Sequence, residues 1–136
     1  MIGTLVDSNV ILDILTEDQV WLDRSSDAVE RCANTGPLFI NVVVYAEVSV
    51  GFQRIEDLEE ALPASDFPRL HIPLEAGFLA AKAYQGYRKR GGAKTSPLPD
   101  FLIGAHAAVA GLQLLTRDAG RYHTYFPNVH TITPSG

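Results

Sequence analysis

Two aspartates follow expected strands in this sequence. Residues 2–6 form a short apolar run that ends at Asp7, and residues 112–116 form a second run shortly before Asp118. Short apolar runs of this kind predict buried strands. Parallel strands present their carboxyl ends at one edge of a sheet, where ligands bind, so we expect both carboxylates at that edge. Taken singly, each aspartate could instead be a turn residue or a helix cap.

Two further acids are expected near helix starts. Asp100 follows Pro99 at the start of an expected helix, where an aspartate is usually a cap. Glu47 is a lone charge in a stretch that is otherwise largely apolar from residue 42 to residue 50. A buried, unpaired carboxylate is costly, so Glu47 needs a partner unless it lies on an exposed helix face. A metal ion shared with other acids would be such a partner.

The residue types available favour a hard cation. The chain has one cysteine, Cys32, and its four histidines lack metal-ligand spacing. Carboxylate oxygens alone fit Mg²⁺ or Mn²⁺ better than Zn²⁺. Such a site suits metal-assisted hydrolysis of a phosphodiester, because the cation can bind a phosphoryl oxygen and lower the pKa of a water.

The elements that must position these acids alternate along the chain. Strands are expected over residues 2–6, 38–40, 70–72, 112–116 and 129–132, and helices over 8–15, 20–33, 56–62, 74–90 and 100–110. The stretch after Asn41 is ambiguous, because its β-branched residues favour a strand whereas Asn41 as a cap favours a helix; we predict a helix. The alternation predicts an α/β fold with a mostly parallel sheet in a single domain, residues 1–136.

The charge is distributed unevenly. The net charge of −5 argues against nucleic-acid binding, yet residues 1–68 carry 13 acidic and three basic residues, whereas residues 69–136 carry three acidic and eight basic residues. A basic segment stands out near two tyrosines, Tyr84 and Tyr87, and consists of Lys82, Arg88, Lys89, Arg90 and Lys94. It could hold an RNA backbone while the tyrosines stack on bases, or it could be a solvated helix end.

Other functional classes find little support. No apolar run approaches the roughly 20 residues of a membrane helix, and the N-terminus lacks the basic start of a signal peptide. A single cysteine is typical of a reducing compartment, so we expect a cytoplasmic protein without membrane contact. His106 lies in an expected helix at a position that favours packing over catalysis.

Four short segments, taken in order, resemble the acidic motifs of PIN-domain ribonucleases, and among these the VapC-type toxins of toxin–antitoxin pairs. The segments are residues 5–10 (LVDSNV), 46–48 (AEV), 99–105 (PDFLIGA) and 115–118 (LTRD). The resemblance implies a three-layer α/β/α sandwich with a five-stranded, mostly parallel sheet. It also implies a Mg²⁺- or Mn²⁺-dependent endoribonuclease that cleaves RNA, forms a homodimer and is inhibited by a cognate antitoxin protein.

The resemblance assigns roles to six residues. Asp7, Glu47 and Asp100 would be the principal catalytic metal ligands, and Asp118 the fourth acid, bound through water. Thr116 matches a supporting hydroxyl position, and Asn9 a polar position beside the first acid.

Two alternatives remain open. A phosphohydrolase with Asp7 as nucleophile would want a second aspartate at position 9, where this chain has Asn9, and a lysine for which Lys94 is a weak candidate. A PIN-like scaffold could bind RNA or protein without cutting, although such a scaffold need not keep all four acids.

Overall fold

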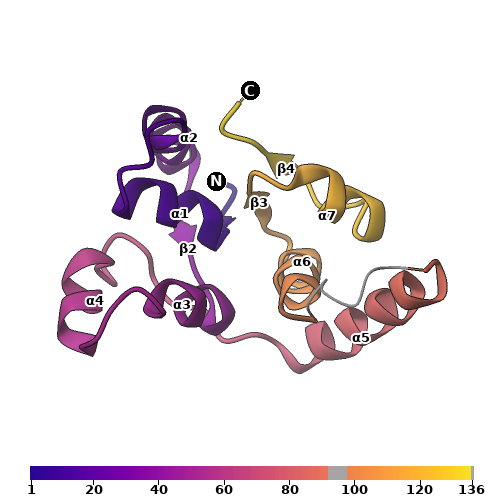
Figure 1. Ribbon diagram of the computed structural model, residues 1–136. Coiled ribbons are helices and arrows are strands. Elements are labelled where there is room, and N and C mark those ends of the chain that lie inside the picture. The colour runs from indigo at the N-terminus through magenta and orange to yellow at the C-terminus, as the bar shows by residue number, and fades with distance from the viewer. Residues whose placement is uncertain (92–97, 136) are drawn as a thin grey trace.

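The computed structural model describes residues 1–91 and 98–135 and has strands alternating with helices (Figure 1). The order is β1 (Thr4–Val6), α1 (Ser8–Leu15), α2 (Leu22–Thr35), β2 (Leu38–Phe39), α3 (Val42–Ser49), α4 (Ile55–Ala61), α5 (Leu74–Lys89), α6 (Leu98–Ala110), β3 (Gln113–Leu115), α7 (Ala119–Tyr125) and β4 (Thr131–Ile132). The expected α/β fold is therefore confirmed, although α3 to α6 follow one another between β2 and β3 with no strand among the described residues there. Among the described residues, no helix is both long and apolar enough to cross a bilayer.

The sheet is parallel throughout, with the strand order β2-β1-β3-β4. Val6 is paired with Leu115, so β1 and β3 end side by side. All three residues of β1 and all three of β3 are buried. Because successive strand residues point to opposite faces, helices must cover both faces of these central strands. The α/β/α layering is thus as expected.

The expected fifth strand over residues 70–72 does not form. The chain makes a single parallel bridge there, between Ile40 and Arg69. The Ile40 amide donates to the Pro68 carbonyl at 3.1 Å, and the Leu70 amide donates to the Ile40 carbonyl at 2.8 Å. Pro68 has no N–H to extend the ladder, and Pro73 already caps α5. The described sheet therefore has four strands.

The ambiguous stretch after Asn41 is a helix, α3. Asn41 is fully buried, and its Oδ1 accepts from the amides of Val43 at 3.0 Å and Val44 at 3.1 Å. Because the oxygen is used by the cap, the amide nitrogen of Asn41 faces Nδ1 of His106, 3.1 Å away. His106 is buried and its pKa is lowered by burial, so the expected packing role is confirmed. This side-chain pair joins the start of α3 to α6.

Helix α7 is absent from the sequence expectation. Residues 119–125 include Gly120 and are too few for a clear apolar period. In the structure α7 lies beside β4 and contacts α6, and Tyr122 and Phe126 at its end are buried (Figure 1). The helix is stabilised by this packing rather than by its local sequence. It also carries residues that reach the expected acidic site.

Candidate active site

Asp7 lies at the carboxyl edge of the sheet, as expected. Its backbone amide donates to the Leu115 carbonyl at 2.9 Å, which sets Asp7 beside Thr116 of the neighbouring strand end. The Asp7 side chain caps α1, and its Oδ1 accepts from the Ser8 amide at 2.7 Å. The parallel pairing of β1 and β3 thus joins two residues that are far apart in sequence.

The second carboxylate oxygen of Asp7 accepts two hydroxyl hydrogen bonds. Thr116 donates to Oδ2 at 2.8 Å and Tyr122 of α7 donates to it at 3.2 Å. Asp7 is 4% exposed, and burial raises its pKa to about 6 even though these hydrogen bonds lower it. Burial raises the pKa of the Tyr122 phenol, and the charge of Asp7 raises it further. The phenol therefore stays protonated and can donate to Asp7. Near pH 7 the site holds a buried carboxylate close to its titration point.

Glu47 reaches the same place from α3. The Ser8 hydroxyl donates to Glu47 Oε1 at 2.8 Å, and the Ser8 amide already binds Asp7. Ser8 therefore bridges the first two acids. Burial raises the pKa of Glu47, and the charge of Asp100 raises it further.

Asp100 lies in the first turn of α6 and forms an ion pair with Arg121 of α7. Burial raises the pKa of Asp100 although Arg121 lowers it, and the charge of Asp118 adds to the rise. Asp100 also contributes to the raised pKa values of Asp7 and Glu47. The charge of Asp100 therefore acts on Asp7 and Glu47, and the charge of Asp118 acts on Asp100.

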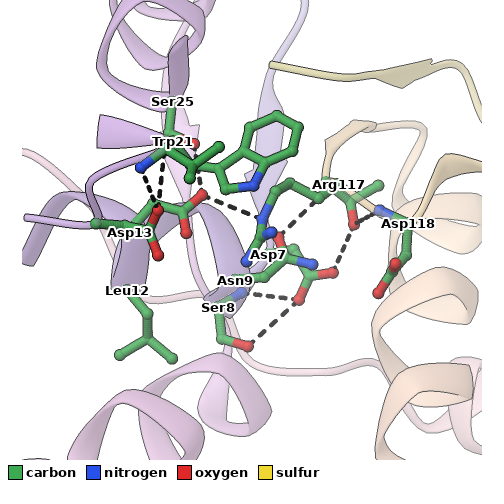
Figure 2. Close-up of polar contacts among 12 residues, drawn as sticks. Asp7, Ser8, Asn9, Leu12, Asp13, Trp21, Ser25, Arg117 and Asp118 are labelled. Carbon is green, nitrogen blue, oxygen red and sulfur yellow. Dashed lines mark hydrogen bonds and ion pairs between the residues drawn. The ribbon is translucent and has the colours of Figure 1, made fainter. Parts of the chain in front are cut away.

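Asp118 is exposed and begins α7. Its amide donates to the Thr116 hydroxyl at 3.0 Å, and this hydroxyl in turn donates to Asp7. Asn9 Oδ1 accepts from the Arg117 amide at 3.3 Å (Figure 2). Thr116 and Asn9 thus hold the connection between β3 and α7 against the start of α1. Thr116 therefore contacts Asp7 directly, whereas Asn9 contacts the backbone that follows β3.

Sequence reasoning missed a second buried acid. Asp13 is 3% exposed, and its Oδ2 pairs with Arg117 Nε at 3.2 Å and accepts from the Ser25 hydroxyl at 2.7 Å (Figure 2). The Arg117 guanidinium also lies 4.9 Å from the centre of the Trp21 ring. The available signal was the same as for Glu47, since Asp13 is a lone charge between apolar residues of α1. This contact ties α1 and α2 to the residue between Thr116 and Asp118.

The donor set fits a hard divalent cation, although the side chains do not form a ready-made cage. In residues 1–91 and 98–135, no three histidine, cysteine, aspartate or glutamate side chains are grouped closely enough to hold a metal ion. The acids that meet here offer carboxylate oxygens only, and their burial and mutual repulsion make a compensating cation favourable. Asp7, Glu47 and Asp100 are the residues that would hold it, with Asp118 at the exposed rim.

The basic segment lies along the end of α5, which packs on α6 (Figure 1). Lys82 lies 5.2 Å from the Phe78 ring centre, Arg88 donates to the Tyr84 hydroxyl at 3.4 Å, and Lys89 is exposed. Arg90 lies over Tyr125, 5.7 Å from the ring centre. Lys94 lies outside the described residues.

An aromatic contact connects this segment to the acids. Tyr125 packs edge-on against Phe101, with 5.3 Å between ring centres, and Phe101 directly follows Asp100 in α6. Arg90, which lies over Tyr125, is therefore close to the helix turn that carries Asp100.

Comparison with known proteins identifies the family of this chain. The profile of the PIN domain family matches residues 4–127. The chain belongs to the PIN domain family. No curated protein sequence matches it.

Several solved structures share the PIN fold of this chain. A toxin–antitoxin complex from Klebsiella pneumoniae matches with a TM-score of 0.67 and 23% identity, over 96% of this chain and 97% of that chain. VapBC2 from Rickettsia felis, bound to a DNA fragment from its promoter, matches with a TM-score of 0.74 and 17% identity, over 96% and 98%. FitAcB from Neisseria gonorrhoeae matches with a TM-score of 0.74 and 19% identity, over 97% and 98%.

Proposed function

We propose that this PIN domain chain, as one domain over residues 1–136, is a Mg²⁺- or Mn²⁺-dependent endoribonuclease and the toxin of a toxin–antitoxin pair in the cytoplasm. The observation that supports the proposal is the Ser8 bridge, whose amide and hydroxyl donate to Asp7 and Glu47, together with the charge effects that link Asp100 to Asp7, Glu47 and Asp118. Three of these acids have raised pKa values because the fold buries them. A fold keeps such a cluster at a cost in stability, which a bound cation and substrate would offset.

The residues around the acids have separate parts in this chemistry. A bound divalent cation would supply a Lewis acid for the phosphoryl oxygen and a water of lowered pKa. Thr116, Tyr122 and Ser8 fix the orientation of the Asp7 carboxylate, and the Ser8 hydroxyl does the same for Glu47. Asp118, at the exposed rim, is free to hold a water or to accept its proton.

RNA would approach along the basic segment defined above. Whole-protein charge repels a polyanion, so binding must depend on a local positive surface. Arg88 and Arg90 lie beside Tyr84 and Tyr125, and arginine next to an aromatic ring is a favourable surface for stacked bases.

A partner protein and a second copy of the chain belong to the same proposal. The described part of the chain exposes apolar side chains on α5, where Leu74 is 91% exposed and Phe78 is 69% exposed. Exposed apolar side chains that neighbour one another on a helix are typical of protein-binding surfaces. The similar structures are toxin–antitoxin complexes, which supports an antitoxin as one such partner.

The ion pair between Arg121 and Asp100 favours a second candidate, a PIN-like scaffold that binds RNA or protein without cutting. In such a protein the arginine would neutralise the cluster permanently, and no cation would be needed. The two candidates differ in whether RNA is cleaved when a divalent cation is added.

The experiment is cleavage of total RNA by the purified chain in Mn²⁺, in Mg²⁺ and in EDTA. We expect cleavage in either metal and none in EDTA. Asp7→Asn, Glu47→Gln and Asp100→Asn should each abolish cleavage, and Asp118→Asn should have a milder effect. Asp57→Asn, an exposed acid of α4, is the matched control and should cut normally. Wild-type cleavage by the three site variants would refute the site assignment, and inert wild-type protein would support the scaffold.

A further inference from the structure

Arg121 is the one cation paired with any of the four acids in the described part of the chain. The other nearby arginine, Arg117, is paired with Asp13. Arg121 therefore neutralises a cluster of carboxylates whose charges otherwise repel one another.

The position of Arg121 follows from α7. The Arg121 amide donates to the Asp118 carbonyl at 3.1 Å, one turn after the helix begins. The next residue, Tyr122, donates to Asp7. Helix α7 thus places the Tyr122 hydroxyl on Asp7 and the Arg121 guanidinium on Asp100.

We infer that Arg121 is a built-in counter-ion that a divalent cation must displace from Asp100, and that the displaced guanidinium then binds a phosphate of the RNA. The inference rests on the proposed metal site and adds to it a residue that the acidic motifs do not include. In the metal-free state Arg121 holds and neutralises the Asp100 carboxylate. In the complex with RNA, Arg121 binds a phosphate instead.

Competition for Asp100 follows from charge. A divalent cation held by the Asp100 carboxylate would lie close to the Arg121 guanidinium, and the two like charges repel each other. Asp100 has an 18% exposed side chain, so this repulsion is only partly screened by water. The arginine has somewhere to go, because its side chain is 43% exposed.

The chemistry of arginine suits the second step. A guanidinium presents planar, paired donors that match the oxygens of a phosphate. Apart from Asp100, no side-chain partner of Arg121 is found among the described residues. Once released, it has donors available at the place where a scissile phosphate would approach the acids.

Calorimetric titration of the metal-free protein with Mn²⁺ tests whether Arg121 competes with the cation for Asp100. Arg121→Gln should bind Mn²⁺ about fivefold more tightly than wild type, the factor expected for loss of one partly exposed ion pair. Arg121→Lys keeps the charge and should restore wild-type affinity. Arg54→Gln makes the same change at an exposed pair with Glu56 on α4 and should have no effect. Circular dichroism checks that each variant is folded.

Fluorescence anisotropy with a single-stranded RNA tests whether the released Arg121 binds an RNA phosphate. Ca²⁺ is used as the cation to slow cleavage. Arg121→Gln should bind RNA about fivefold more weakly than wild type does. The two effects have opposite signs, tighter for metal and weaker for RNA. A purely structural ion pair would weaken both, so the combination identifies the proposed role.

The outcomes separate this inference from the proposed function. Unchanged or weaker Mn²⁺ binding by Arg121→Gln overturns the counter-ion, and unchanged RNA binding overturns the phosphate ligand. A wild-type protein that binds no Mn²⁺ overturns the whole inference. Tighter Mn²⁺ binding and weaker RNA binding without RNA cleavage would support Arg121 while refuting the nuclease.

Discussion

Asp13 of α1 and Arg117 of the β3–α7 connection form an ion pair with 3.2 Å between Oδ2 and Nε. Asp13 is 3% exposed, whereas a third of the Arg117 side chain is exposed. The Arg117 amide is also bound by Asn9, so both ends of this arginine are fixed to α1. Arg117 lies between Thr116 and Asp118, and the pair therefore controls where these two site residues lie.

Asp13→Asn should weaken the fold and reduce RNA cleavage together. The variant leaves the Arg117 charge without its partner, which costs about 2 kcal/mol for a pair buried on one side. Cleavage should fall by about tenfold, because a loosened connection misplaces Thr116 and Asp118. Urea denaturation and an RNA cleavage assay measure the two effects. Asp23→Asn, an exposed acid of α2, is the control, and equal behaviour of the two variants would refute the role of the pair.

The contribution of Asp7 to the stability of the metal-free protein should rise as the pH falls from 7.5 to 4.5. The pKa of Asp7 is raised from 3.8 to about 6, so the folded state takes up a proton in this range before the unfolded state does. A folded pKa above the unfolded value means that ionised Asp7 destabilises the fold above about pH 6. The raised pKa values of Glu47 and Asp100 act in the same direction.

Asp7→Asn isolates this contribution. In EDTA it should raise the free energy of unfolding by up to about 3 kcal/mol at pH 7.5 and by about 1 kcal/mol at pH 4.5, since one pKa unit corresponds to about 1.4 kcal/mol. Thermal melts of both proteins across the pH range measure the difference. A difference in stability between the two proteins that does not grow with pH would contradict the burial of a charged Asp7.

The basic end of α5 should determine the salt dependence of RNA binding. Replacing Arg88, Lys89 and Arg90 with alanine should flatten the slope of log affinity against log salt by up to about 2 units, since each single-strand phosphate contributes roughly 0.7. Anisotropy in EDTA across a salt series measures the slope. Mn²⁺ affinity should barely change, because these side chains are not ligands.

A triple variant within residues 1–68 is the matched control for the loss of three positive charges. Replacing Arg24, Arg31 and Arg54 with alanine removes the same three positive charges from other exposed positions. It should leave the slope nearly unchanged. If both triple variants lowered the slope equally, total charge rather than the α5 end would govern binding.

Gly104→Ala should destabilise the protein and disturb the site. A Cβ at position 104 would lie 2.4 Å from Phe126 Cδ2 and 3.0 Å from Tyr122 Cδ1, so α7 would have to shift. We expect a loss of about 2 kcal/mol from this overpacking, and lower activity because Tyr122 donates to Asp7. Urea denaturation measures the loss. Gly77→Ala on α5, where nothing lies within 4 Å, should instead stabilise by up to about 1 kcal/mol.

Local physical rules were sufficient for much of the fold. Apolar runs predicted β1 and β3, and Asn41 predicted the start of α3 because a cap acts on amides two and three residues away. The expectation that Asp7 lies at the edge where β1 and β3 end followed from the common edge of parallel strands. Asp7, Asp100 and Asp118 were proposed as site residues from strand ends and a helix start, and Glu47 because it is a lone charge in an apolar stretch.

The tertiary structure alone decided which side chains meet. Arg121 binds Asp100 because α7 packs against α6, and neither the helix nor its packing is apparent in residues 119–125. Arg117 binds Asp13 because β3 ends beside the start of α1. The expected fifth strand over residues 70–72 does not form. Apolar side chains favour a strand, but pairing also needs backbone donors, and Pro68 has no N–H at this edge of the sheet. Such contacts depend on packing between distant segments, whereas local sequence restricts only neighbouring residues.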